Sequence, residues 1–420
     1  MLIEFKFKNF KSFKNETSLD FSATKISEFN IHVRNVSNQK VLPLSVIYGG
    51  NASGKTNVID AFSYMTNYVL NSFSYSDEEK NDKLDFFSNI PFLFDLDSKK
   101  NPSEFEIYFT VQNPDDEKIY NYGFSIREGK VEEEWLNYKA KTSRGNYRTI
   151  FYRNILENKL DLSGLPKKSH DNIKISLGKE VLIVSLGAKL RIEKLKIVRD
   201  WFSKNKFADF GGPLNNYFIS KTLPVNFIEK EVQNSVVKYL STFDPSIIGF
   251  NVEVSFSNNI NDNKRKIYNI ESIHKVNGTN KTVSIPIEKE SAGTLKMFSL
   301  YQYFQDVFKN GSVLLIDELN ARLHPLLVRS IILSFANPEI NNKNAQLLFT
   351  SHDSWLLESD TLRRDEFWFT EKNFDGISSL YSLVDFKSED GNKIRKDENY
   401  EKNYLIGKYG AIPKLSQLIF

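Results

Sequence analysis

The 420-residue chain contains no cysteine. Without thiols it can form neither disulfides nor thiolate zinc sites, and it cannot use a cysteine nucleophile. It also lacks any apolar run near the ~20 residues that a membrane-spanning helix needs. No signal peptide is evident, because the first residues, MLIEFKFKNF, alternate apolar and charged side chains as a strand does. These absences predict a cytoplasmic protein with no membrane partner.

The net charge of the chain is small as well. The formal charge is +3, which is too small to indicate nucleic-acid binding from bulk electrostatics. Hydrophobic residues make up 40% of the chain and charged residues 26%, as in a globular protein with a packed core. A chain of this length can bury a large core and ordinarily divides into two or three units.

The most informative stretch is VIYGGNASGKTNVIDAF, which matches the pattern G-x-x-x-x-G-K-[ST]. An apolar run precedes it and a helical pattern follows, whereas a chance glycine-rich turn would lack this context. Gly49 and Gly54 permit backbone angles that let successive N–H groups face an anion. Lys55 can place its charge against the β- and γ-phosphates, and the Thr56 hydroxyl can ligate Mg²⁺. We expect the nucleotide to be bound by Gly49, Gly50, Asn51, Ala52, Ser53, Gly54, Lys55, Thr56 and Asn57.

Two acidic residues follow the apolar run SVLLI and supply the second half of the expected site. Asp317 is placed to hold Mg²⁺ as the partner of Thr56. Glu318, one residue further along, points elsewhere and can act as general base on the attacking water. Solvated acids that end a strand would give the same pattern, so it is the upstream phosphate loop that favours the catalytic interpretation.

A histidine, His352, comes just after the strand-like run from Gln346 to Thr350. In that position it can hydrogen-bond the γ-phosphate or the attacking water. A lone histidine is more often structural, and only its place after the other motifs argues for function. The sequence thus predicts Lys55, Glu318 and His352 as catalytic residues, with ATP and Mg²⁺ as cofactors.

A third candidate is the stretch ESAGTLKMFSL, which begins a helix. Ser291 and Gly293 at a helix N-terminus form an anion-binding turn, with one hydroxyl, free N–H groups and the helix dipole. Helix capping explains Ser-x-Gly equally well. The order of the motifs along the chain, with the phosphate loop first and the histidine last, favours a phosphate contact.

The order of predicted elements indicates an α/β fold. Strands and helices alternate after residue 285, which argues for a mainly parallel sheet covered by helices, while alternation from Phe105 to Tyr138 predicts an antiparallel meander. We expect an N-terminal lobe of the nucleotide domain at 1–189, a helical and β-stranded insertion at 190–285 and a C-terminal lobe at 286–420. Aromatic side chains in the insertion could fill its own core or form a docking surface; they are Trp201, Phe202, Phe207, Phe210, Tyr217 and Phe218.

The set GGNASGKT, ESAGT, LLIDELNARLHP and TSHD resembles the ABC-type ATPases of the structural-maintenance-of-chromosomes (SMC) and RecF kind. It is still more similar to the AAA-type ATPases of bacterial abortive-infection systems, the AbiL/RloA-like proteins. The opening FKFKNFKSFKNETSLDFSA, the run LRRDEFWFTEK and the late YLIGKYGAIP are also similar to that family. The resemblance therefore reaches both ends of the chain and is weakest in the insertion.

The resemblance implies an ABC-type ATPase head in which two protomers enclose ATP. Ser291 and Gly293 of one chain would then face the phosphate loop, acid pair and histidine of another, in a homodimer or higher homo-oligomer. Two departures affect this expectation. Asn320 stands where the family usually has aspartate, and the lid residue, often glutamine, falls near Lys189 without a safe assignment.

Two functions fit these observations. The first is an ATPase subunit of an anti-phage system that controls a separate effector, a nuclease, since the chain shows no nuclease motif of its own. The second is an SMC- or RecF-like repair or recombination ATPase that clamps DNA, which makes DNA a further candidate partner. A neighbouring gene for an effector would favour the first function, and a neighbouring repair gene the second.

Overall fold

The structure, a computed structural model, describes the larger part of the chain. It divides into two compact units, with the first built from Met1–Phe207, Val307–Glu318 and Ile331–Phe420, and the second from Ala208–Asp306 and Leu319–Ser330. The domain boundaries expected from the sequence stay a prediction. The described residues are 1–76, 91–111, 117–141, 146–210, 223–257, 265–358, 360–387, 394–396 and 398–413.

The first unit contains a seven-stranded antiparallel sheet in the order β10-β9-β8-β7-β6-β1-β2. The predicted N-terminal hairpin forms, with Phe5 opposite Leu19 in β2 and opposite Ile107 in β6. The predicted meander is present and longer than expected, because β9 and β10 extend it. The strands are β1 (Leu2–Lys8), β2 (Thr17–Asp20), β6 (Ser103–Thr110), β7 (Lys118–Arg127), β8 (Lys130–Ala140), β9 (Arg148–Asn154) and β10 (Lys159–Asp161).

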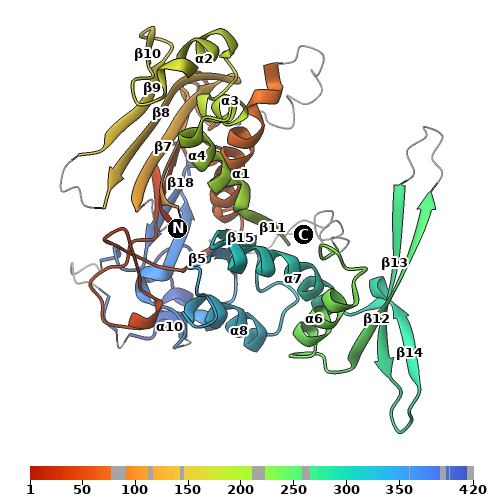
Figure 1. The fold of residues 1–420 in the computed structure, drawn as a ribbon. Helices are drawn as coiled ribbons and strands as arrows, with labels where there is room; N and C mark the ends of the chain where they lie inside the picture. Colours follow the sequence, from red (N-terminus) through yellow and green to blue (C-terminus); the bar gives the residue numbers. More distant parts are fainter. Residues whose placement is uncertain are drawn as a thin grey trace. The chain divides into compact units, whose positions relative to one another are not determined.

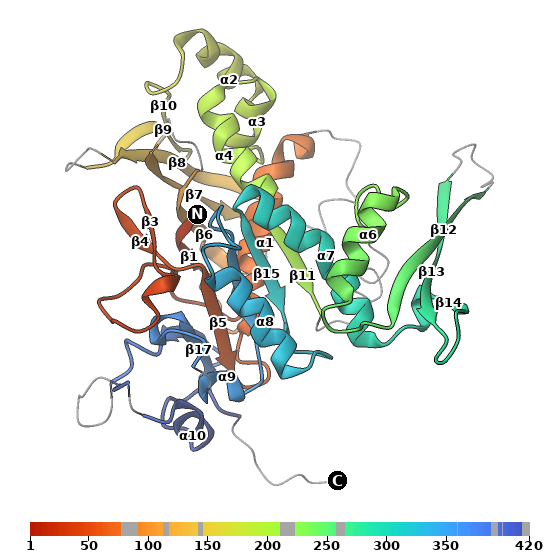
Figure 2. The same ribbon diagram turned by 60° about the horizontal axis from the view of Figure 1, so that its bottom comes forward.

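A second, six-stranded sheet has the order β11-β15-β16-β5-β17-β18. Its strands β15, β16, β5 and β17 run parallel, and β18 pairs with β17 in the antiparallel direction. This mainly parallel sheet confirms the α/β fold class. Figure 2 shows β5 beside β17, although these strands are far apart in the sequence. The strands are β5 (Leu44–Gly49), β11 (Lys206–Asp209), β15 (Val313–Asp317), β16 (Gln346–Thr350), β17 (Phe367–Lys372) and β18 (Ser378–Ser382).

Helix α1 (Lys55–Asn71) packs in the core of the first unit and begins where the phosphate loop ends. Its buried side chains recur at helical spacing, as Val58, Phe62 and Met65 illustrate. Helix α4 (Glu193–Lys204) packs against α1. Trp201 and Phe202 of α4 belong to this same core, with the Trp201 ring centroid 4.5 Å from that of Phe109. These two aromatics are therefore core residues and are not available for docking. Other helices here are α2 (His170–Ser176), α3 (Ile183–Lys189), α9 (Trp355–Glu358) and α10 (Tyr400–Leu405).

A buried ionic network surrounds the start of β17, within the run LRRDEFWFTEK. The Arg363 guanidinium donates to both oxygens of Asp365 at 2.9 Å, and His32 Nδ1 lies 2.9 Å from Glu366 Oε1. All four side chains are at most 4% exposed, and burial raises the pKa of Glu366. Because an uncompensated buried charge is costly, these pairs fix the segment that precedes β17.

The second unit contains a three-stranded antiparallel sheet in the order β12-β13-β14 and helix α6 (Figure 1). Its core is aromatic, with the rings of Phe227, Phe250 and Phe298 stacked edge to face or tilted, and Tyr239 against Tyr301. Tyr217 and Phe218 lie outside the described residues. Helices α7 and α8 each have residues in both units. The elements are α6 (Lys230–Leu240), β12 (Ile247–Ser257), β13 (Arg265–Lys275), β14 (Thr282–Pro286), α7 (Ala292–Asn310) and α8 (Pro325–Ala336).

Candidate nucleotide-binding site

The phosphate loop joins the fully buried strand β5 to α1. Gly54 lies at φ 114°, a conformation that side chains disfavour, and Ala52 also has a positive φ of 61°. A Cβ at Gly49 would come within 2.4 Å of Thr370 Oγ1 and 2.5 Å of Ser53 Oγ. Both glycines are therefore required by local geometry. The loop turns so tightly here that its backbone N–H groups can face an anion at the start of α1.

Lys55 folds back over this loop. Its Nζ donates to the carbonyl oxygens of Gly49 at 2.9 Å and Gly50 at 3.0 Å, and the residue is 7% exposed. Burial lowers the pKa of Lys55 to about 8, against the opposing effect of Asp317 and Glu318. The ammonium group is therefore protonated below about pH 8 and increasingly neutral above it, and a bound anion would raise this pKa.

Asp317, the last residue of β15, connects the loop to the sheet. Its Oδ2 accepts a hydrogen bond of 2.8 Å from Thr56 Oγ1, and its Oδ1 accepts one of 2.5 Å from Thr350 Oγ1. The residue is only 4% exposed, so its carboxylate depends on these two donors. The sequence assigned Thr56 and Asp317 to one metal site, and the structure brings these two side chains together.

Glu318 follows in a left-handed backbone conformation, at φ 55°. Its Oε1 lies 3.8 Å from His352 Nε2, and both side chains remain more than a third exposed. Burial, and next the positive charge of Lys55, lower the pKa of His352, while Glu318 opposes the change. The lowered pKa favours the neutral imidazole, which can accept or donate a hydrogen bond at this site.

Ser291 and Gly293 belong to the second unit. Ser291 Oγ accepts from the backbone N–H of Thr294 at 3.1 Å and lies 2.8 Å from Thr294 Oγ1. A Cβ at Gly293 would come within 3.0 Å of the Arg322 carbonyl oxygen, so this glycine permits a close approach of the loop after Glu318. In this structure Ser291 caps the helix, and its phosphate contact stays a prediction.

The family resemblance also singled out two further positions, Lys189 and Asn320. Lys189 ends α3, where its Nζ lies 5.5 Å from the centre of the Phe73 ring. Asn320 follows the acid pair, and its Oδ1 is buried with no hydrogen-bond partner among the described residues. Near it, Lys296 of α7 donates to the carbonyls of Leu319 and Ala321, both at 2.9 Å. Lys296 therefore fixes the backbone of the loop that carries Asn320.

Sequence reasoning missed the hydroxyls that support the phosphate loop, which belong to Ser12, Thr370 and Ser378. Ser53 Oγ lies 2.6 Å from Thr370 Oγ1, and Ser378 Oγ donates to the Ser53 carbonyl at 2.7 Å. Ser12 bonds both Ser378 and Asn57. Thr350 was missed as well. Isolated serines and threonines carry no motif, and only the pairing of distant strands shows that they meet.

The donor set fits a magnesium ion. Mg²⁺ prefers hard oxygen ligands, usually one or two from the protein in addition to water and phosphate. The Thr56 hydroxyl and the Asp317 carboxylate are within hydrogen-bond distance of each other, at the edge of the phosphate loop. These two residues would hold the ion, and their role as metal ligands stays a prediction.

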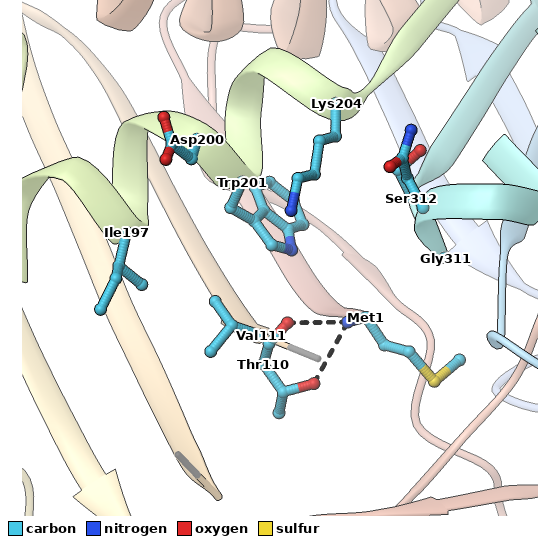
Figure 3. Close-up of a pocket in the computed structure, with 10 residues that line it drawn as sticks. Met1, Thr110, Val111, Ile197, Asp200, Trp201, Lys204, Gly311 and Ser312 are labelled. Carbon is cyan, nitrogen blue, oxygen red and sulfur yellow. Dashed lines mark hydrogen bonds between the residues drawn. The ribbon is translucent and has the colours of Figure 1, made fainter. Parts of the chain in front are cut away.

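A separate cavity of about 170 Å³ lies beside α4 and is lined by none of the predicted site residues (Figure 3). Lys204 and Trp201 point toward it, and the Met1 amine donates to Thr110 O at its floor. Among the described residues no helix is long and apolar enough to cross a membrane.

Comparison with known proteins identifies the family of the chain. A family model described as "AAA domain, putative AbiEii toxin, Type IV TA system" matches residues 44–358, which include every predicted site residue. The chain belongs to this family. It is therefore an ATPase-type protein of the AAA class, as the motifs predict. A search of curated proteins found no match.

Solved structures add two more distant likenesses. One is an SmcHead bound to the C-winged helix domain of ScpA, at 14% identity, with a TM-score of 0.45, 91% of this chain covered and 97% of the other. The second is the recombination mediator RecF with ATP, at 15% identity, with a TM-score of 0.32 and the same two coverages.

Proposed function

We propose that this AAA family member binds and hydrolyses ATP with Mg²⁺ and serves as the ATPase subunit of a bacterial anti-phage, abortive-infection system. The observation that carries the proposal is the convergence of three sequence motifs, the phosphate loop, the acid pair and the histidine, in the first unit. Lys55, Thr56, Asp317, Glu318 and His352 come from the ends of β5, β15 and β16, and Thr56 bonds Asp317 directly.

The proposed chemistry assigns one task to each group. Lys55 exchanges the carbonyls of Gly49 and Gly50 for phosphate oxygens, and Thr56 with Asp317 holds Mg²⁺, which when bound neutralises developing phosphate charge. Glu318 lies partly exposed beside the metal carboxylate, where it can accept a proton from water. His352, 3.8 Å from Glu318, can orient that water or the γ-phosphate.

A second copy of the chain completes the proposed site. Ser291 and Gly293 lie in the second unit, on a turn that begins the long helix α7. A helix N-terminus is favourable for a phosphate group. In the proposed homodimer or higher homo-oligomer, this turn contacts the γ-phosphate that the other protomer holds. ATP then favours the closed dimer by its greater affinity for that state.

The proposed output is control of a separate effector, a nuclease. Among the described residues no group of three or more His, Asp or Glu side chains is arranged to hold a metal. The family description names a toxin of a toxin–antitoxin system, which supports a role in growth arrest during infection.

The test has a biochemical and a cellular arm. Purified protein should release phosphate from ATP only with Mg²⁺, and Glu318→Gln should slow this release by roughly 10²–10⁴-fold. Bacteria carrying the gene with its native neighbours should resist phage, and Lys55→Ala should remove the resistance. Hydrolysis without resistance, but with ATP-dependent retention of DNA, would overturn the defence role in favour of a DNA-clamping ATPase.

A further inference from the structure

Thr350 lies at the centre of the candidate site, although no motif includes it in a catalytic role. It is the last residue of β16 and is fully buried. Strand β16 lies between β15, which ends at Asp317, and β5, which ends at Gly49. Thr350 is thus adjacent both to the strand that supplies the acid pair and to the strand that supplies the phosphate loop.

The hydroxyl of Thr350 has two partners, which together define its direction. A hydroxyl has one hydrogen to donate and can accept others. Thr350 Oγ1 donates to Asp317 Oδ1 at 2.5 Å and accepts from the backbone N–H of Glu318 at 2.8 Å. One side chain therefore holds both members of the acid pair, the first through its carboxylate and the second through its backbone.

Both contacts constrain the acid pair. Because Asp317 Oδ1 is engaged by Thr350, Oδ2 is the oxygen that faces Thr56, at 2.8 Å. Glu318 adopts φ 55°, a strained conformation that a non-glycine residue keeps only where the surrounding structure holds it. The hydrogen bond from Glu318 N to Thr350 supports the left-handed backbone that aims the Glu318 carboxylate toward His352.

We propose that Thr350 is a positioning residue for ATP hydrolysis, which orients the carboxylate of Asp317 and fixes the backbone of Glu318. This inference rests on the proposed function. Thr350 does not touch the nucleotide in this assignment, and it acts through its two neighbours. Removal of its hydroxyl takes from Asp317 one of its two donors, leaving the bond from Thr56, and takes from the Glu318 N–H its Thr350 acceptor. The phosphate loop keeps its own support from Thr370 and Ser378.

The inference predicts a division between binding and turnover. Thr350→Val keeps the shape and removes the hydroxyl. ATP affinity should change less than about threefold, whereas kcat should fall about 10–100-fold, because a small misplacement of reacting groups costs that much. Thr350→Ser keeps the hydroxyl and should retain kcat within about threefold.

Thr361 offers a matched control. It is 1% exposed, and its Oγ1 has no hydrogen-bond partner among the described residues, so Thr361→Val makes the same chemical change at a buried site without loss of a contact. Thr361→Val should leave kcat unchanged. In a Glu318→Gln background, Thr350→Val should add little further loss, because residues that act as one unit are not additive.

The experiment measures ATP hydrolysis, binding of a non-hydrolysable ATP analogue and thermal unfolding for these variants. Thr350→Val with normal kcat, or with equal losses of kcat and affinity, would overturn the assignment. If Thr350→Val does not fold, Thr350→Ser decides: loss of kcat with intact binding would show that packing of the methyl group, and not the hydroxyl, matters. Absence of hydrolysis by the wild-type protein would instead overturn the proposed function itself.

Discussion

The hydroxyl of Ser378 donates a 2.7 Å hydrogen bond to the carbonyl oxygen of Ser53, although the two residues are 325 positions apart. Ser378 lies in the edge strand β18, and Ser53 lies inside the phosphate loop. The C-terminal hairpin β17–β18 is therefore part of the structure that shapes the loop.

Loss of the Ser378 hydroxyl should weaken nucleotide binding. Ser378→Ala removes hydrogen bonds to Ser53 and Ser12 at a buried position, and a buried acceptor left unpaired costs about 1–3 kcal/mol. ATP affinity should fall by about threefold or more, measured by isothermal titration. Ser379→Ala, at the next and exposed position, should have no effect. Equal affinities for the two variants would contradict this role for β18.

Lys55 and Glu318 should separate binding from hydrolysis. Lys55→Ala should lose nucleotide affinity, since the positive charge in the loop disappears. Glu318→Gln should bind ATP normally and hydrolyse it roughly 10²–10⁴-fold more slowly, because it lacks the general base. Fluorescent-nucleotide titration and phosphate release measure the two quantities. Near-normal turnover by Glu318→Gln would remove the role assigned to it.

Nucleotide affinity should fall as the pH rises through about 8. Burial lowers the pKa of Lys55 to about 8 in the free protein, so below that pH the ammonium is present and above it the group is increasingly neutral. Bound phosphate should raise this pKa, and ATP binding near pH 8 should therefore take up protons. Calorimetry in buffers of different ionisation enthalpy measures this uptake. Lys55→Arg should abolish it, because arginine stays protonated; the same uptake in that variant would exclude Lys55 as its source.

The site should require two chains. Lys55→Ala and Ser291→Arg proteins should each be inactive, whereas a mixture should regain activity through dimers that combine Lys55 of one protomer with Ser291 of the other. The measurement is ATP hydrolysis against mixing ratio. Failed rescue alone is ambiguous if the two sites are coupled. Full activity of Ser291→Arg by itself would refute the composite site.

Gly49→Ala should destabilise the protein more than Gly129→Ala, because only the Cβ at Gly49 would overlap neighbouring atoms. A Cβ at Gly49 would overlap Thr370 and Ser53, while a Cβ at Gly129, where φ is 76°, would meet no atom within 4 Å. Gly129→Ala should cost about 1–2 kcal/mol from backbone strain alone. Gly49→Ala should exceed that cost and abolish nucleotide binding. Denaturant unfolding and nucleotide titration test both, and equal costs would contradict the steric explanation.

Local patterns in the sequence predicted the central parts of this fold. The spacing of Val58, Phe62 and Met65 identified α1, and alternation of Phe105 and Ile107 identified β6. Pairing of β5 with β17 could not be predicted, because strand neighbours depend on contacts between distant segments. The same limit applies to Ser378 and Thr350, whose partners are set by strand order.

The predicted insertion shows a different limit. Leu195, Val198 and Phe202 recur at the spacing of one buried helix face in α4. Which core they enter depends on the neighbours of α4, and these turned out to be α1 and Phe109. Periodicity identifies a buried face but does not identify what covers it.

Strand order also has a consequence for synthesis of the chain on the ribosome. The phosphate loop is translated early. Thr370 and Ser378, whose hydroxyls hydrogen-bond Ser53 of the loop, are added more than 300 residues later. A nascent chain that has emerged only as far as β16 carries the intact motif without its support. Nucleotide should therefore be captured late in translation, and prematurely terminated chains should not compete for ATP.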